Sequence, residues 1–207
     1  VVETLTDATI GCIKDMSEIE AVGHRVVHGG AYFSESMLLT DDVIEKLGHC
    51  IDLAPLHTPA HLMGIKGCTE AMPGVPQVLV FDTAFHQSMP SHAYMYGLPY
   101  EYYEKYGIRR YGFHGTSHKY VSAKGAKFAG LDINYSKIIT CHLGNGSSIS
   151  AVVNGKSIDT TMGFTPLEGL IMGTRCGNVD PDVVTYIQEK EGLSAAEMSK
   201  VLNKKSG

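Results

Sequence analysis

Three pairs of histidines occur along the chain at positions i and i+4, a spacing that places two metal ligands on one face of a helix. The pairs are His24/His28, His57/His61 and His114/His118. The first pair lies in a predicted strand, where four residues span about 13 Å. No pair has Glu directly after its first His, so the HExxH pattern of zinc proteases is absent. A zinc hydrolase therefore stays open as an alternative that little in the sequence favours.

A glycine-rich segment, residues 142–148 (HLGNGSS), lies between two predicted strands. Glycines let backbone N–H groups approach a phosphate closely, and Ser and Asn side chains add further donors. The segment lacks the Gly-Lys-Ser/Thr of a Walker A loop and does not follow the GxGxxG pattern. Two interpretations remain open from the residues alone, a phosphate-binding loop and an ordinary tight turn.

Two arginines, Arg25 and Arg175, stand among glycines and apolar residues, which is a poor setting for an idle surface charge. The planar guanidinium suits the paired oxygens of a carboxylate or a phosphate. Both residues are therefore candidates for holding an anion. A structural salt bridge to a nearby acid is the alternative for each.

Asp82 and His114 are the other candidates for chemistry. Asp82 directly follows the apolar run Val78–Phe81, and open α/β sheets place functional groups at the carboxyl ends of their strands. A turn or helix cap is the alternative for this carboxylate. His114 stands between Phe113 and Gly115, where a packed core histidine is the alternative.

The composition narrows the class of protein. The 207 residues are 43% hydrophobic and 19% charged, which suits a globular fold, and the net charge of −5 argues against a nucleic-acid partner. No apolar run approaches the roughly 20 residues that cross a membrane. The five cysteines are dispersed, at positions 12, 50, 68, 141 and 176. An odd, dispersed set favours reduced thiols and a cytoplasmic location.

Strands and helices that could position these residues alternate along the chain. Residues 21–27 and 78–81 read as strands, and helices are expected from Asp41, capped by Thr40, and from Pro59 to about Pro73. Val43, Ile44, Leu47 and Ile51 form the apolar stripe expected of the first helix.

The later half of the chain has equally clear signals. Gly115-Thr116-Ser117 is expected to cap a helix that runs to about Ala129, and 137–141 reads as a buried strand. Asn154-Gly155 predicts a hairpin between strands 147–153 and 156–161. Further helices are expected from Asp180 to Gly192 and after the capping box of Ser194 and Glu197. The pattern predicts an α/β class with mixed sheets.

Six ordered motifs resemble the acetate kinase (acetokinase) family along essentially the whole chain. They are GHRVVHGGAYF (23–33), APLHTPAH (54–61), FDTAFH (81–86), RRYGFHGTSHKYV (109–121), CHLGNGSS (141–148) and DTTMGFTPLEGLIMGTRCGNVDPDV (159–183). One such motif could arise by chance, but six in this order and spacing are very specific.

The resemblance implies an actin-like ATPase (ribonuclease H-like) fold, with two related domains that flank a cleft. Residues 1–84 would be the later part of the first domain, on the acyl-substrate side. Residues 85–207 would be the early part of the second, with the ATP phosphate loop and the phosphoryl-transfer residues. The ends of the chain suggest an internal fragment, and a homodimer is implied for the parent protein.

The resemblance also implies a reaction, the reversible transfer of a phosphoryl group from ATP to acetate, which gives acetyl phosphate and ADP. Arg25 and Arg175 would neutralise carboxylate and phosphoryl charge, His114 would stabilise the transition state, and Asp82 would be catalytic. The ATP phosphates would contact His142, Leu143, Gly144, Asn145 and Gly146. The pocket for the acetate methyl group would comprise Val27, Leu56, Phe113 and Pro166.

Asp82 raises a chemical question, because the attacking acetate is already ionised at neutral pH and needs no general base. We therefore expect Asp82 to orient an arginine or a magnesium-bound water. The family's Mg²⁺ ligand and its first phosphate loop match no part of this chain, so we expect little turnover from the chain alone. A propionate or butyrate kinase and a non-catalytic interaction module are the main alternatives.

Overall fold

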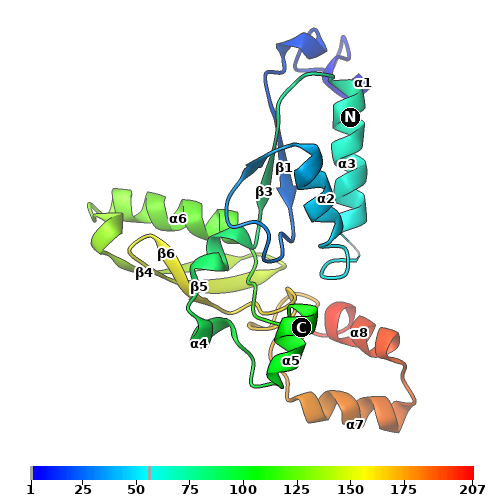
Figure 1. Cartoon of the computed structure of the whole chain (residues 1–207), viewed down its shortest axis with the longest axis vertical. Helices are drawn as coiled ribbons and strands as arrows, with labels where there is room; N and C mark the ends of the chain where they lie inside the picture. The colour runs from blue at the N-terminus through cyan, green and yellow to red at the C-terminus, as the bar shows by residue number, and fades with distance from the viewer. Residues whose placement is uncertain (1, 56) are drawn as a thin grey trace. The chain divides into compact units, whose positions relative to one another are not determined.

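The computed structural model describes residues 2–55 and 57–207, and the chain divides into two compact units (Figure 1). Unit 1 comprises Val1–Ala84 and unit 2 comprises Phe85–Gly207. Each unit has its own three-stranded sheet and its own helices. The assignment of these units to two actin-like domains stays a prediction.

The sheet of unit 1 has the order β1-β3-β2. Its strands are β1 (Val22–Val26), β2 (Met37–Leu38) and β3 (Gln77–Phe81). β1 runs parallel to β3 and β2 runs antiparallel to it, so this sheet is mixed, as predicted. The register pairs Val26 with Phe81, which brings the carboxyl ends of β1 and β3 to the same edge.

Unit 1 also contains four helices within its described residues. They are α1 (Val2–Leu5), η1 (Met16–Glu18), α2 (Asp41–Gly48) and α3 (Thr58–Ala71). The predicted N-cap of α2 is confirmed, because the Thr40 hydroxyl accepts a hydrogen bond from the backbone N–H of Val43.

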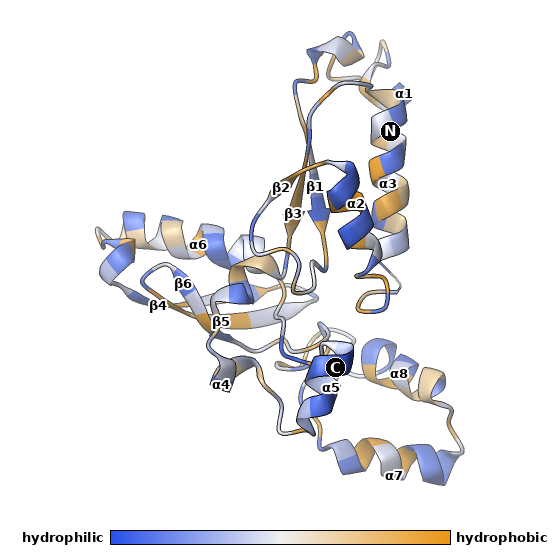
Figure 2. Cartoon of the chain, in the orientation of Figure 1, coloured by the Kyte–Doolittle hydropathy of each residue, from blue (hydrophilic) through white to orange (hydrophobic). Residues whose placement is uncertain are grey.

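The core of unit 1 forms where β1 and β3 meet α2 and α3. Phe33 stacks on Phe81 with ring centroids 4.2 Å apart, and β3 is apolar over most of its length (Figure 2). Val43 and Leu47 are buried from α2. The expectation that Ile44 and Ile51 complete this stripe is wrong: both are more than a third exposed. α2 ends at Gly48, so Ile51 lies beyond the helix.

The sheet of unit 2 has the order β4-β5-β6 and is entirely antiparallel, so the prediction of a mixed sheet is wrong for this unit. Its strands are β4 (Lys137–Leu143), β5 (Ser147–Val153) and β6 (Lys156–Thr160). The predicted hairpin is confirmed: Asn154 and Gly155 have φ angles of 52° and 74°, which a two-residue turn of this kind requires.

The expectation that β4 is buried is also wrong, because Ile139 and Leu143 are 66% and 73% exposed. β4 is an edge strand of this sheet, and only Thr140 on it is fully buried. The helix α6 packs against β4. Residues that alternate along β4 therefore divide between a covered face and an open one.

Unit 2 also contains several helices, joined by loops of which 161–180 is the longest. The helices are η2 (Ala84–Ser88), which begins one residue before the boundary, α4 (Ser91–Tyr94), α5 (Tyr100–Tyr106), α6 (Gly115–Phe128), η3 (Ile133–Tyr135), α7 (Pro181–Glu191) and α8 (Ala195–Lys204). Asp180 caps α7, Gly192 ends it, and Ser194 and Glu197 form the capping box of α8, as predicted. Across residues 2–55 and 57–207, no helix is both long enough and apolar enough to span a membrane.

Candidate active site

Arg25 and Asp82 form a two-bond ion pair at the carboxyl ends of β1 and β3. The Arg25 Nε donates to Asp82 Oδ1 at 3.0 Å, and its Nη2 donates to Oδ2 at 2.6 Å. The parallel register explains the meeting, because it pairs Val26 with Phe81 and the Asp82 backbone N–H donates to the Val26 carbonyl. Two residues that are 57 positions apart in the chain thus become neighbours.

The guanidinium of Arg25 is exposed, whereas the carboxylate of Asp82 is buried. The Asp82 side chain is 2% exposed, whereas that of Arg25 is 64% exposed. The hydrogen bonds to Asp82 raise the pKa of Arg25. A guanidinium fixed by a buried carboxylate is pre-organised to receive an anion on its exposed side, since its orientation is set before the anion arrives.

Val27 follows β1 and is half-buried, next to the imidazole of His61. The Val27 backbone N–H donates to His61 Nε2 at 3.2 Å, so this nitrogen accepts and carries no proton. Burial, and then the charges of His57 and Arg25, lower the pKa of His61. Leu56, the other apolar pocket residue predicted in unit 1, lies outside the described residues.

His114 occupies the N-cap position of α6 in a left-handed conformation, with φ of 56°, which is uncommon for a residue other than glycine. The predicted cap at Gly115-Thr116-Ser117 is wrong, because these residues form the first turn of α6; the His114 side chain makes no capping bond either. The ring instead stacks on His142, with centroids 3.9 Å apart, and its Nδ1 is 2.8 Å from the Ser148 hydroxyl.

The predicted phosphate loop is shorter than its sequence segment. His142 and Leu143 belong to β4, and only Gly144-Asn145-Gly146 forms the turn into β5. The turn is closed by a hydrogen bond from the Gly144 N–H to the Gly146 carbonyl. It is a tight hairpin turn, which is compatible with either interpretation made from the residues.

Arg175 reaches this turn. A Cβ atom built on Gly146 would lie 3.4 Å from Arg175 Nη1 and 3.6 Å from His114 Cε1, so the three residues converge on one place in unit 2. The Arg175 Nη1 donates to the Pro166 carbonyl at 2.8 Å and lies 3.7 Å from the thioether of Met172. Neutral groups therefore orient this guanidinium.

Gly173 fixes the position of the same turn. Its N–H donates to the Asn145 carbonyl, and a Cβ at this position would lie 2.1 Å from the side-chain oxygen of Asn145. A side chain here would displace the side-chain amide of Asn145.

Hydrogen bonds beside His114 also involve residues that the predicted acetokinase site does not include, among them His118, Thr140 and Ser117. His118, on α6, bonds Ser148 and Thr140, and His142 Nδ1 is 2.9 Å from the hydroxyl of Ser117. The pKa of His118 is lowered to about 3, mainly by burial and to a smaller extent by the charges of neighbouring histidines. The i, i+4 spacing of His114 and His118 was the available signal, but it indicated a metal site rather than a hydrogen-bond network.

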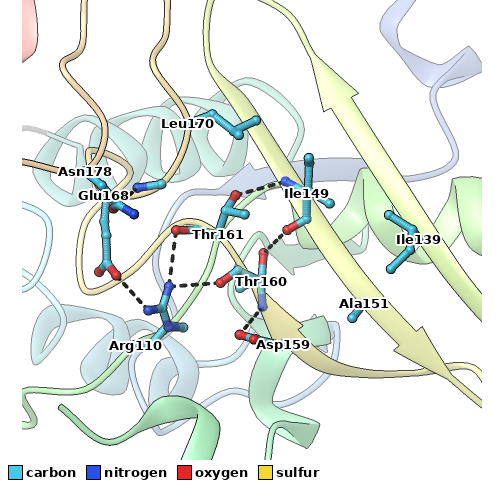
Figure 3. Close-up of a pocket in the computed structure, with 11 residues that line it drawn as sticks. Arg110, Ile139, Ile149, Ala151, Asp159, Thr160, Thr161, Glu168, Leu170 and Asn178 are labelled. Carbon is cyan, nitrogen blue, oxygen red and sulfur yellow. Dashed lines mark hydrogen bonds and ion pairs between the residues drawn. The ribbon is translucent and has the colours of Figure 1, made fainter. Parts of the chain in front are cut away.

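A separate cavity of about 400 Å³ lies on the face of the unit 2 sheet opposite Thr140 and Ser148 (Figure 3). Ile139, Ile149 and Leu170 line it, and Arg110 forms one side. Figure 3 shows Arg110 bonded to the backbone of β6 and the following residue and to Glu168. Tyr96 donates to Glu168, and burial, followed by this bond, raises the pKa of Tyr96. Arg110 thus has a structural role: it links the end of β6 to Glu168.

No group of three or more His, Cys, Asp or Glu side chains in the described part of the chain could hold a metal ion. The paired histidines bond other partners: Nδ1 of His28 accepts from the Gly30 N–H, and His118 bonds two hydroxyl groups.

Comparison with known proteins adds to this geometry. The profile of the acetokinase family matches residues 1–207. The chain belongs to the acetokinase family. The acetate kinase of Caldanaerobacter subterraneus subsp. tengcongensis is 67% identical over all 207 residues, which are 52% of that enzyme. The chain thus spans about half the length of the curated relatives it matches.

Solved structures of acetokinase relatives agree with the fold. The Porphyromonas gingivalis acetate kinase superposes with a TM-score of 0.96 at 56% identity, over 100% of this chain and 52% of its own. A propionate kinase from Francisella tularensis has a TM-score of 0.89 at 56% identity, over 94% of this chain and 50% of its own. Acetate kinases have the actin-like ATPase fold, so the predicted α/β class and fold are confirmed.

Proposed function

We propose that the protein transfers a phosphoryl group reversibly between ATP and acetate, forming acetyl phosphate and ADP. The observation that carries the proposal is the convergence of Arg175, His114 and the Gly146 turn in an acetokinase-family chain. Phosphoryl transfer requires mainly positioning and charge neutralisation. A cation, an imidazole and a glycine-rich turn are suitable groups for both.

In this proposal the two arginines bind anionic oxygens, and His114 donates a hydrogen bond to the phosphoryl group in the transition state. Fixed donors meet the charge on the equatorial oxygens without reorganising, which is where such groups contribute most. The ATP phosphates contact residues 142–146, chiefly through the backbone of the turn.

Asp82 acts through Arg25 in this proposal. The attacking carboxylate has no proton to lose, so a base would have no task. The two hydrogen bonds between Asp82 and Arg25 support an orienting role.

The acyl group is short. Val27, Leu56, Phe113 and Pro166 are proposed to surround its methyl group, and Phe113 is 2% exposed. One methylene changes binding in such a pocket by about 1–3 kcal/mol. Propionate is therefore expected to be a poorer but real substrate, and a panel of short acids assayed for acyl phosphate measures the preference.

On the family resemblance the reaction also uses Mg²⁺, held by residues that match no part of this chain, so no step is assigned to a metal held by the described residues. A homodimer and a cytoplasmic location remain part of the proposal, on the family resemblance.

The test uses a chimera in which this chain replaces the matching half of the Caldanaerobacter acetate kinase. We expect the chimera to form acyl phosphate from ATP and acetate, trapped as the hydroxamate, whereas the 207-residue chain alone gives little or no turnover. A correctly folded chimera that binds ATP but forms no acyl phosphate would contradict the proposal and favour a non-catalytic module.

A further inference from the structure

The hydroxyl group of Ser148 lies between two imidazoles. Its Oγ is 2.8 Å from His114 Nδ1 and 2.7 Å from His118 Nε2, and the residue is fully buried. A serine hydroxyl has one hydrogen to donate. If it donates to one histidine, it must accept from the other, so the protonation states of the two rings are linked.

The far end of this chain of contacts is Thr140, on β4. Its Oγ1 is 2.8 Å from His118 Nδ1, whereas its other acceptor, the Ser150 carbonyl, is 3.5 Å away. The short contact is the stronger hydrogen bond. A Thr140 hydrogen directed at the Ser150 carbonyl would make only this long contact, so we assign the donation to His118 Nδ1, which makes that nitrogen the acceptor.

The proton on His118 then follows. The ring is 1% exposed, and burial lowers its pKa to about 3, so it is neutral and carries a single N–H. With Nδ1 accepting, the proton lies on Nε2 and is donated to Ser148. Ser148 in turn donates to His114 Nδ1.

We propose that Thr140, His118 and Ser148 form a directional hydrogen-bond relay that holds His114 as the neutral tautomer with its proton on Nε2. The reverse direction would place a proton on His114 Nδ1 and end on the long contact from Thr140 to Ser150. His118 and Ser148 are positioning residues, since they act through His114.

Other imidazoles and a guanidinium surround His114. His142 stacks on it with an interplanar angle of 19°, and Arg175 lies near the same turn. His118 is kept neutral on the other side, and His86 is the next ring beyond it, 5.6 Å away. Two cations in this group would repel each other.

The functional consequence rests on the proposed function above. A fixed Nε2–H is a hydrogen-bond donor that needs no proton uptake when a phosphoryl group passes, so His114 stabilises charge rather than exchanging protons. The tautomer itself can be tested without any assay of activity.

The test is a two-bond ¹H–¹⁵N correlation spectrum of the ¹⁵N-labelled 207-residue chain at neutral pH, which distinguishes protonated from unprotonated ring nitrogens. We expect unprotonated Nδ1 and protonated Nε2 in both His114 and His118. A protonated Nδ1 on His114 would overturn the proposal, whatever the activity of the protein.

Variants sharpen the result. Ser148→Ala removes the hydrogen donated to His114 and should give a mixture of tautomers, whereas Ser148→Thr keeps the hydroxyl and should restore one. Ser150→Ala is the matched control, since Ser150 lies on the same face of β5, is equally buried and bonds only Asp159 and Ser157 through its side chain. An unchanged His114 spectrum in Ser148→Ala would count against the relay.

The chimera then separates the relay from the reaction. Ser148→Ala should lower kcat more than it changes KM. The loss in kcat should be smaller than the roughly 10²–10³-fold loss that follows removal of a whole transition-state donor. If the tautomer shifts as expected while kcat stays constant, the relay stands and the role proposed for His114 fails.

Discussion

Each of the two units has a candidate arginine, but a negatively charged group orients the one in unit 1 and a neutral group orients the one in unit 2. In unit 1 the buried carboxylate of Asp82 takes two hydrogen bonds from Arg25. In unit 2 Arg175 donates to the carbonyl of Pro166, and no ion pair involves it in the described part of the chain.

The difference concerns how much positive charge remains for a ligand. Arg25 is oriented but largely neutralised by its partner, whereas Arg175 is oriented by a neutral carbonyl and keeps its full charge. The rest of the unit 2 site consists of imidazoles, hydroxyls and backbone amides. We therefore expect unit 2 to depend on one uncompensated cation and unit 1 on the geometry of a pair.

The largest effect is expected from Arg175→Lys in the chimera. Lysine keeps a charge but loses the planar fork, so acyl phosphate formation should fall by about 10²–10⁴-fold. Lys156→Ala, which removes an exposed charge on β6, is the control and should behave as the parent. A loss of less than about threefold in Arg175→Lys would remove the contrast drawn between the units, because so small a change falls short of a lost donor.

Acid should destabilise the protein through the buried His118 of unit 2. The folded-state pKa of His118, about 3, lies below the ordinary value of 6.5, so the unfolded chain binds the extra proton. This stability is fully present above pH 6.5 and is lost as the pH falls toward 3. The slope from this one group is about 1.4 kcal/mol per pH unit.

Urea unfolding of the 207-residue chain at several pH values measures that slope. His118→Gln should flatten it, while His61→Gln, in unit 1, reports the parallel effect of a histidine whose pKa is also lowered. The same pH dependence in His118→Gln and in the parent would show that folding does not lower the pKa of His118.

A smaller loss of activity is expected from Asp82→Asn. The amide can still accept from Arg25 but cannot take both bonds as a carboxylate does, so we expect about a tenfold loss, equal to about 1.4 kcal/mol. Both limbs of the pH–rate profile should persist. Loss of one limb in this variant alone would identify Asp82 as a general base.

The smallest effect is expected on stability, from a change beside the turn at residues 144–146. Gly173→Ala would push Asn145 away and should cost about 1 kcal/mol of stability, as overpacking does. Gly125→Ala, on α6, meets nothing within 4 Å and should stabilise the protein by about 0.5–1 kcal/mol. Equal effects in thermal unfolding would mean that Asn145 adjusts at no cost.

Local signals predicted most of the elements, because caps, hairpin turns and apolar strands are encoded in adjacent residues. Thr40, Asn154-Gly155 and the Ser194 capping box all behave as predicted. The exposure of β4 could not be predicted in this way, since its apolar residues do not reveal whether a neighbouring strand or layer covers them.

The candidate site shows the same limit. The residue types marked Arg25 and Asp82 separately, but their pairing depends on the register of two parallel strands. The spacing of His114 and His118 was visible, yet its meaning required Ser148, which comes from another element. Long-range pairing of this kind decides the chemistry and is absent from any short segment.

The central claim is that the ion pair of Arg25 and Asp82 functions as a whole, with Asp82 acting only through Arg25. A double-mutant cycle of Arg25→Gln and Asp82→Asn in the chimera tests it most directly, with kcat/KM normalised to the folded fraction. We predict that Asp82→Asn has no further effect once Arg25 has been replaced. An undiminished loss from Asp82→Asn in the Arg25→Gln background would contradict the claim.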